Sequence, residues 1–274
     1  MPMINRGLVH KSLLETAWGT VLFAAGLCAF HALAAVAAAK FYTGIVETLA
    51  QLEIARYILA ALLGTSDADI VGPAAFAALP WVHPLPLVLL FAHAITYATR
   101  MPAGETDHGT IDVLLAFPVS RATVYASESV AWMVSSVMLF AGGFLGHFAG
   151  AFWTGKDQPP SMLQLLMFNA NLFTLYLAVG GVAWISSAVS NRRGRAAGAT
   201  FAVLLASMIV SAMASFNEVI ARIGFLGLLY YFRPFQIVQG GDWPLQDLLI
   251  LFIVALAAWI TGLCIFRRRD LPTI

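Results

Sequence analysis

Charge is scarce in this sequence. Of 274 residues only 11% are Asp, Glu, Lys or Arg, while 60% are hydrophobic and the mean hydropathy is +0.83. Soluble domains usually carry about 25% charged and 45–50% apolar residues. The composition therefore excludes an ordinary water-soluble domain and predicts an integral membrane protein. A net charge of +1 also gives no basis for a nucleic-acid partner.

Residues that usually carry catalytic or metal chemistry are equally few. The two cysteines, Cys28 and Cys264, lie in apolar runs and fit no metal or redox spacing. The sequence has no Ser-His-Asp order, no H-E-x-x-H motif and no paired carboxylates inside an apolar run. The phosphate loop G-x-x-x-x-G-K-[ST] is also missing, because TGKDQ around Lys156 lacks its pattern. We therefore expect no catalytic, cofactor or metal site on this chain.

Long apolar runs are abundant instead. A helix needs about 20 mostly apolar residues to cross the hydrocarbon core of a bilayer. Backbone groups facing lipid must be bonded within their own segment, so each such run is expected to be a helix. The predicted fold is an all-α polytopic membrane protein, a single transmembrane domain over residues 1–274. Its six predicted spans are 18–39, 82–100, 123–152, 163–189, 196–215 and 245–266.

The basic residues predict the orientation. Six crossings put both termini on one side, and Lys and Arg collect on the cytoplasmic side of membrane proteins. The side of the termini would hold ten of the 15 basic residues and the other side five. Both termini are therefore predicted to be cytoplasmic. The ten residues are Arg6, Lys11, Arg100, Arg121, Arg192, Arg193, Arg195, Arg267, Arg268 and Arg269.

Two predicted outer segments are more than short turns. Residues 41–81 contain GIVETLAQLEIARYILAALLG, which is typical of an amphipathic helix along the interface. Residues 216–244 carry aromatic side chains suited to an interfacial belt, and Pro234 and Gly240–Gly241 should break the chain there. If both segments inserted, the count would be eight spans. The aromatic residues are Tyr230, Tyr231, Phe232 and Trp243.

The predicted cytoplasmic hairpin, residues 101–121, is unusually polar for this chain. Pro102 and Gly104 should interrupt the preceding helix, and Gly109 allows a tight turn. TIDVLLAF should then form a short helix with Thr110 as its N-cap, ended by Pro118. A second cap, Ser120, should start the third span.

One side of that short helix is apolar, and the acids lie away from it. Ile111, Leu114 and Leu115 share the apolar side at i, i+3, i+4 spacing. An interfacial helix is one interpretation, but carboxylates are unfavourable against an anionic lipid surface. A basic groove on a partner protein would suit them better. The acids are Glu105, Asp107 and Asp112.

GETDHGTIDVLLAFPVSRATVYASE resembles the segment after the second span of ATP-binding-cassette permeases of the ABC-2 type. LVHKSLLETAWG, in an elbow of about residues 4–17, is similar to the amphipathic helix before their first span. SSAVSNRRGRAAG is similar to the loop between the fourth and fifth spans, and FRRRDLP to the usual ending. The resemblance covers the chain in order. It departs at Glu128, where a lysine often stands.

The resemblance implies a mechanism and partners. Two permease subunits, identical or different, would pair in the inner (plasma) membrane, and each would contact a cytosolic ATP-binding-cassette ATPase. ATP and Mg²⁺ would bind that ATPase, and the short cytoplasmic helix would pass its movement to the spans. The implied ATPase-coupling interface is Glu105, Asp107, Thr110, Asp112, Pro118 and Arg121.

Further candidate residues lie inside the spans. Intramembrane histidines are candidate functional groups, so a substrate pathway could include His31, His93 and His147, although single hydrogen-bonded histidines are the simpler interpretation. Gly142, Gly146 and Gly150 are four apart, which suits close helix packing within the chain or at a dimer interface. Asn169 and Asn171 could bond across helices.

The sequence thus predicts the permease subunit of an ATP-driven exporter with an unidentified substrate. A channel or secondary transporter is the main alternative, but it would favour charged residues at mid-membrane and broken helices. An intramembrane enzyme is a weaker alternative, and an ATPase-linked complex that performs mechanical work without moving a solute is a further one.

Overall fold

The structure is a computed structural model that describes residues 3–52, 54, 73–154, 160–214 and 217–270. Within these residues all regular structure is helical. Six helical segments are long and apolar enough to span a membrane, so the predicted all-α, six-span fold is confirmed. These segments are Arg6–Lys40, Ala77–Ala98, Arg121–Thr154, Met162–Val189, Arg193–Ala214 and Leu245–Arg268.

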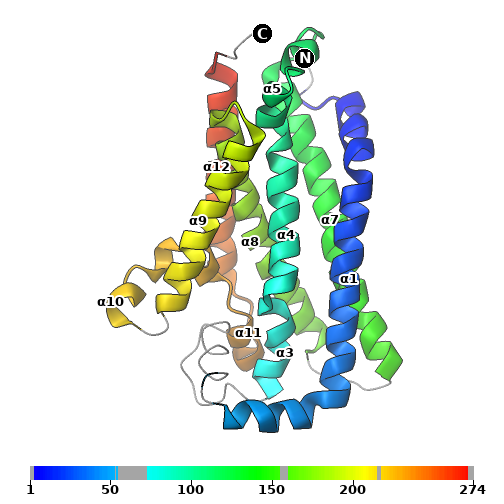
Figure 1. Cartoon of the computed structure of the whole chain (residues 1–274), viewed down its shortest axis with the longest axis vertical. Coiled ribbons are helices and arrows are strands. Elements are labelled where there is room, and N and C mark those ends of the chain that lie inside the picture. Colours follow the sequence, from blue (N-terminus) through cyan, green and yellow to red (C-terminus); the bar gives the residue numbers. More distant parts are fainter. Residues whose placement is uncertain (1–2, 53, 55–72, 155–159, 215–216, 271–274) are drawn as a thin grey trace.

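The long helices run roughly side by side along the long axis of the molecule (Figure 1). Because α7 has 34 residues, it exceeds the length that a bilayer requires, as its sequence predicts. The long helices are α1 (Arg6–Gln51), α4 (Pro84–Ala98), α7 (Arg121–Thr154), α8 (Met162–Val189), α9 (Arg193–Ala214) and α12 (Leu245–Arg268), and α3 (Pro73–Val82) precedes α4.

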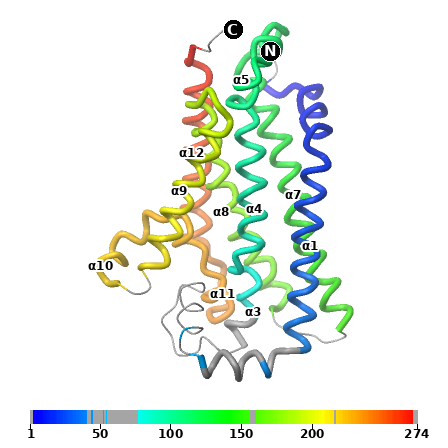
Figure 2. Tube along the Cα trace, viewed as in Figure 1, coloured from blue at the N-terminus to red at the C-terminus, as the bar shows by residue number. Residues whose placement is uncertain are grey.

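Short helices fill the connections at the two ends. Between α4 and α7 lie η2 (Arg100–Gly104), α5 (Glu105–Asp107) and α6 (Ile111–Leu115). Between α9 and α12 lie α10 (Glu218–Ala221), η3 (Gly224–Leu226), η4 (Leu228–Tyr231) and α11 (Pro234–Gly240). The tube in Figure 2 shows that the hairpin with α5 shares one end of the bundle with both termini, while α10 and α11 lie toward the other end. We call these the hairpin end and the distal end.

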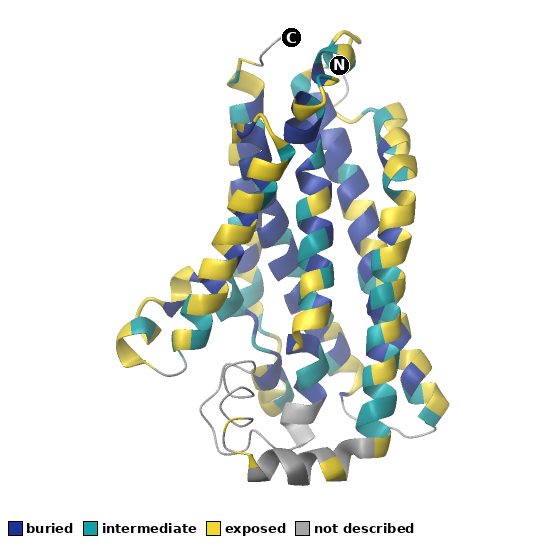
Figure 3. Cartoon of the chain, viewed as in Figure 1, coloured by how far each residue is buried: buried dark blue, intermediate teal, exposed yellow. Residues whose placement is uncertain are grey.

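Helix α8 forms the centre of the bundle. Most of its residues are buried, including Trp184, Tyr176 and Phe168, and it contacts α4, α9, α11 and α12. By contrast, α1, α9 and α12 expose wide apolar faces, which Figure 3 shows as yellow and teal stretches along their outer sides. Exposed apolar faces on peripheral helices suit contact with lipid or with another membrane chain.

Helix α1 packs along α7 through the predicted glycine stripe. A Cβ added at Gly146 would lie 2.1 Å from the carbonyl oxygen of Cys28, and one at Gly142 would lie 2.7 Å from that of Ala24. At Gly150 the corresponding distance, to the carbonyl of Ala32, is 2.4 Å. The structure therefore places these glycines in an internal helix contact, where the missing side chains let two backbones approach.

The N-terminal region differs from the sequence expectation at one point. The expected elbow of about residues 4–17 and the first span are one continuous helix, α1. Asn5 starts it, since its side-chain oxygen accepts the backbone N–H groups of Gly7 and Leu8 at 2.9 and 3.2 Å. Helix α1 contains no proline, so nothing in it forces a break. Most of the predicted outer segment 41–81 lies outside the described residues, apart from the end of α1 and from α3.

Candidate functional site

The hairpin between α4 and α7 begins with a break in the helical path. Met101 has extended backbone angles, φ −129° and ψ 131°, so the chain leaves the axis of α4 just before the predicted breaker Pro102. Gly109 has φ 70°, the left-handed conformation that glycine adopts without steric cost. The predicted interruption and tight turn are both confirmed. Together they reverse the chain within a few residues.

Helix α6 packs one side against the bundle and leaves the other free. Ile111 is buried, and Leu114 and Leu115 are partly buried against the core, as their spacing predicts. Val113 and Phe117 point the other way and are 65% and 61% exposed. No pattern in the sequence identified these two side chains as a contact surface. An exposed apolar pair at a helix tip is suited to a protein contact.

Thr110 occupies the N-cap position of α6, as predicted, but its side chain makes no capping hydrogen bond. Its hydroxyl donates to the carbonyl oxygen of Glu105 at 3.2 Å and also to the Glu105 carboxylate, rather than accepting a backbone N–H of α6. The N-cap position is therefore predicted correctly but without a side-chain cap, and the N–H of Leu114 donates to the backbone carbonyl of Thr110 at 3.1 Å. The predicted cap at Ser120 is confirmed, since its oxygen accepts the N–H of Thr123 at 3.0 Å.

The base of the hairpin is fastened to the connection between α8 and α9. The Asp107 carboxylate accepts the backbone N–H of Arg193 at 3.1 Å, and the Arg193 guanidinium donates to the carbonyl of Thr96 at 2.9 Å. The backbone N–H of Ala103 donates to the Ser187 hydroxyl at 3.1 Å. Two of the segments that carry the family resemblance therefore contact each other in space.

Arg121 joins the hairpin to the C-terminal end of the bundle. Its guanidinium donates to the carbonyl of Phe266 at 3.3 Å and to that of Arg269. Arg269, whose pKa is lowered by burial, in turn donates to the residues that end α8. Its acceptors are the carbonyls of Ala188 at 2.7 Å and Ser190 at 3.0 Å, and the side chain of Asn191. The half-buried Arg121 thus has an internal role that its place in the predicted contact set did not include.

A buried ionic cluster lies beside the hairpin. Arg100 contacts Glu128 at 2.6 Å, and it also contacts Glu15 and Ser12. Ser12 donates to Glu128 at 2.8 Å and bonds to the Tyr97 hydroxyl at 2.9 Å. Glu128 is only 7% exposed. This arrangement gives a physical reason for an acid at the position where the resembling family often has lysine, because Arg100 already supplies the positive charge.

The remaining predicted hairpin residues are accessible to different degrees. Asp107, Thr110 and Pro118 are exposed, whereas Glu105 and Asp112 are half-buried. Among the described residues, the Asp112 side chain has no ion pair or hydrogen bond. The structure therefore brings the six predicted contact residues to one end of the bundle. Of the three acids, Asp112 is the one whose side chain makes no hydrogen bond or ion pair with the described residues.

The three membrane histidines lie apart from the cavities described below. His31 stacks beside Trp81 with ring centroids 4.5 Å apart, and His93 bonds to the Tyr176 hydroxyl through Nδ1 at 2.9 Å. His147 is half-buried on α7 beside Phe148. Among the described residues, no group of three or more His, Cys, Asp or Glu side chains could hold a metal ion. The histidines therefore lie among internal helix contacts.

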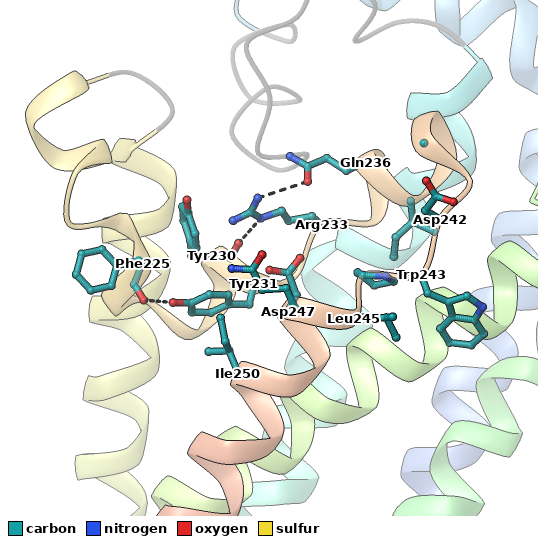
Figure 4. Close-up of a pocket in the computed structure, with 14 residues that line it drawn as sticks. Phe225, Tyr230, Tyr231, Arg233, Gln236, Asp242, Trp243, Leu245, Asp247 and Ile250 are labelled. Atoms are coloured by element: carbon teal, nitrogen blue, oxygen red, sulfur yellow. Dashed lines mark hydrogen bonds between the residues drawn. The ribbon is translucent and has the colours of Figure 1, made fainter.

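Two cavities adjoin at the distal end. A groove of about 1280 Å³ runs between α4 and α9, with walls formed mainly by apolar side chains such as Phe91, Phe201 and Met208. A smaller polar pocket of about 630 Å³ lies between η4, α11 and the start of α12 (Figure 4). Tyr230, Arg233 and Gln236 line both cavities.

The distal pocket is held open by backbone contacts. Asn171 on α8 donates to the carbonyl of Tyr231 at 2.9 Å and accepts the N–H of Arg233 at 3.3 Å, so it does bond across helices. Within the described part of the chain, Asn169 bonds only to the carbonyl of Leu165 in its own helix. Burial, with Tyr230 and Asp247 nearby, raises the pKa of Tyr231, whose hydroxyl donates to the Phe225 carbonyl at 2.7 Å.

Breaks in the chain define the limits of that pocket. Pro234 occupies the start of α11, and Gly241 ends α11 in the left-handed conformation with φ 70°. Both breaks are predicted from the sequence and are confirmed. They turn the chain from η4 through α11 into α12, and so bring the charged residues Arg233, Asp242 and Asp247 around one cavity.

Comparison with known proteins gives one clear result. Residues 27–271 match the family model described as ABC-2 family transporter protein. Neither the curated proteins nor the solved structures contain a match. The matched range covers α7, α8, α9, α12, the hairpin and most of α1. With six membrane-capable helices and this match over most of its length, the chain belongs to the ABC-2 transporter family and is a multi-pass membrane component of a transport system.

Proposed function

We propose that this chain is the permease subunit of an ATP-driven exporter in the inner (plasma) membrane, and that its hairpin receives the movement of a separate ATPase. ATP and Mg²⁺ belong to that ATPase, and a second permease subunit completes the transporter. The hairpin end, with both termini, faces the cytoplasm in this proposal. The exposed apolar faces of α1 and α9 are available to the second subunit.

The observation that supports this proposal most strongly is that the tip of the hairpin is exposed while its base is bonded to neighbouring helices. The tip presents Val113, Phe117 and Pro118 to the surroundings. The base is joined to α8, α9 and α12 through Asp107–Arg193 and Arg121–Arg269. A force applied to the tip would therefore reach three spans without first bending a flexible loop. Closely packed elements move as units, so this arrangement suits force transmission.

Charge reversal at the hairpin tests the coupling. Reversing both Glu105 and Asp112 to lysine should abolish ATP-driven transport while leaving membrane insertion intact. Because Glu105 also accepts the Thr110 hydroxyl, Asp112→Lys alone is the cleaner variant. We expect it to lower substrate-stimulated ATP hydrolysis about tenfold or more, since mispaired charges at an interface cost several kcal/mol. The assay uses the permease together with the ATP-binding-cassette ATPase that co-purifies with it.

The matched control is Glu218→Lys. Glu218 is an exposed acid in the first turn of the short helix α10 at the distal end. It should keep normal coupling, because the proposed ATPase contact lies at the other end of the bundle. Equal activity of Asp112→Lys and wild type would contradict the hairpin assignment.

A further inference from the structure

The groove and the distal pocket form one continuous surface with an ordered change of chemistry. From Pro84 to Thr96 the α4 wall rises about 18 Å at the usual 1.5 Å per residue. This distance is more than half of a hydrocarbon core about 30 Å thick. The groove ends at Arg233, beyond which the pocket carries Asp242 and Asp247. Along this surface the lining therefore changes from apolar side chains to the positive Arg233 and then to the negative Asp242 and Asp247.

Arg233 forms no ion pair with Asp242 or Asp247, although Asp247 lies near enough to attract it electrostatically. Its Nε donates to the Tyr230 carbonyl at 2.8 Å, its Nη1 contacts Gln236 at 3.5 Å, and its guanidinium lies 4.3 Å from the centre of the Tyr230 ring. Among the described residues it forms no ion pair within 4.0 Å. Figure 4 shows Asp247, in the first turn of α12, below Arg233 in the view, and Asp242 beyond the end of α11. Both signs of charge are therefore available to a guest.

We infer that the substrate is an amphiphile of the zwitterionic phospholipid type, an inference that rests on the exporter function proposed above. Its hydrocarbon tails lie in the groove between α4 and α9. Its phosphate, which is next to the tails, pairs with Arg233, because guanidinium groups bind phosphate through parallel hydrogen bonds. Its amine, at the tip of the head, reaches Asp242 and Asp247. The order of charges along the head thus matches the order along the cavity.

The groove favours tails that arrive from the bilayer. Val88 on α4, with Phe201 and Met208 on α9, is 52–60% exposed, so both walls are accessible from the side. A tail can enter between these helices without crossing water, whereas a fully polar solute would leave the long apolar wall unmatched. These features argue against a small ion or a free sugar as the guest.

Lipid binding to the purified full chain tests the inference. Native mass spectrometry with added phosphatidylethanolamine, phosphatidylglycerol or diacylglycerol gives the dissociation constant of each. Wild type should bind the ethanolamine lipid most tightly, the glycerol lipid less tightly and diacylglycerol weakest. Arg233→Gln should weaken binding of both phospholipids about tenfold, because a charge-assisted hydrogen bond is lost. The double variant Asp242→Asn, Asp247→Asn should weaken only the ethanolamine lipid.

Matched variants separate this site from general lipid contact. Leu205→Trp, which fills the groove, should weaken all three lipids, while Val203→Trp on the same helix lies outside the groove lining and should not. Arg222→Gln and Glu218→Gln remove exposed distal charges that line neither cavity and should have no effect.

Three outcomes would overturn the inference. They are equal binding of the three lipids, unchanged dissociation constants of both phospholipids in Arg233→Gln, and loss of association between two permease copies as the only effect of Leu205→Trp. The assay needs no ATPase, so its result is independent of coupling. If the lipid selectivity is observed but Asp112→Lys still couples ATP hydrolysis to transport, the proposed exporter mechanism is wrong and the lipid site stands. If Asp112→Lys is uncoupled but the lipid selectivity is absent, only the proposed substrate class is wrong.

Discussion

The two ends of this bundle treat charge in opposite ways. At the hairpin end Arg100 pairs with Glu128 and Glu15, while Arg121, Arg193 and Arg269 donate to neighbouring backbone carbonyls. At the distal end Arg233 lies beside a cavity lined by Asp242 and Asp247, and among the described residues it forms no ion pair within 4.0 Å. Paired charges fix the relative positions of helices, whereas unpaired charges around a cavity keep their capacity for a guest. The comparison therefore distinguishes the hairpin end, which is suited to transmitting movement, from the distal end, which is suited to binding a guest.

Breaking the buried cluster at the hairpin end should have the largest effect on stability. Arg100→Leu leaves Glu128, which is 7% exposed, without its cation. Loss of one partner from a buried pair usually costs about 3–5 kcal/mol. We expect a marked fall in the unfolding temperature in detergent, measured by intrinsic fluorescence. The matched distal variant, Arg233→Leu, should lose much less, because it leaves no buried partner behind.

A compensating variant sharpens that experiment. Removing both charges, as in Arg100→Leu with Glu128→Leu, should recover most of the lost stability, since uncharged side chains need no partner. If the double variant is no more stable than Arg100→Leu alone, then packing rather than charge pairing holds this end together.

The packing of α1 against α7, which extends between the two ends, should show the next largest effect on stability. Gly146→Ala places a Cβ 2.1 Å from the Cys28 carbonyl, so α1 and α7 must separate. Overpacking of this kind costs about 1–3 kcal/mol, occasionally more. The same change at Gly19 on α1, where an added Cβ meets nothing within 4 Å, should have little effect. Equal unfolding temperatures for the two variants would contradict the internal packing of the stripe.

Arg269 should give the smallest of the three effects. Arg269→Ala removes hydrogen bonds to Ala188, Ser190 and Asn191, a loss of about 1–2 kcal/mol for this partly exposed group. Its exposed neighbour Arg268 provides the control variant Arg268→Ala. Unfolding temperature and ATPase stimulation, measured together, should both fall for Arg269→Ala only. If the two alanine variants behave alike, the link between α12 and α8 does not contribute to the hairpin end.

Local patterns in the sequence predict most of the fold and little of this comparison. The six spans, the turn at Gly109, the cap at Ser120 and the break at Gly241 each depend on a few neighbouring residues, and each is confirmed. Periodicity also places the apolar side of α6 correctly. Such features follow from backbone geometry and local burial, which neighbouring residues determine.

The paired and unpaired charges depend on contacts between distant segments. Arg100 meets residues 28 and 85 positions away, Glu128 and Glu15, and no spacing rule connects them. One signal was present, because an acid such as Glu128 inside an apolar run needs a partner. The distal pocket combines residues of η4, α11 and α12, whose approach depends on tertiary packing. The exposure of Val113 and Phe117 could likewise not be read from periodicity alone.

Cross-linking from the two ends tests the central claim most directly. In a chain with Cys28 and Cys264 replaced by serine, Val113→Cys places a thiol on the hairpin and Val219→Cys places one on α10, at positions 65% and 73% exposed. Each chain is co-expressed with the ATP-binding-cassette ATPase that co-purifies with the permease and is treated with a short thiol-to-amine cross-linker. Our account predicts a permease–ATPase product from Val113→Cys and none from Val219→Cys. A product from Val219→Cys alone would contradict it.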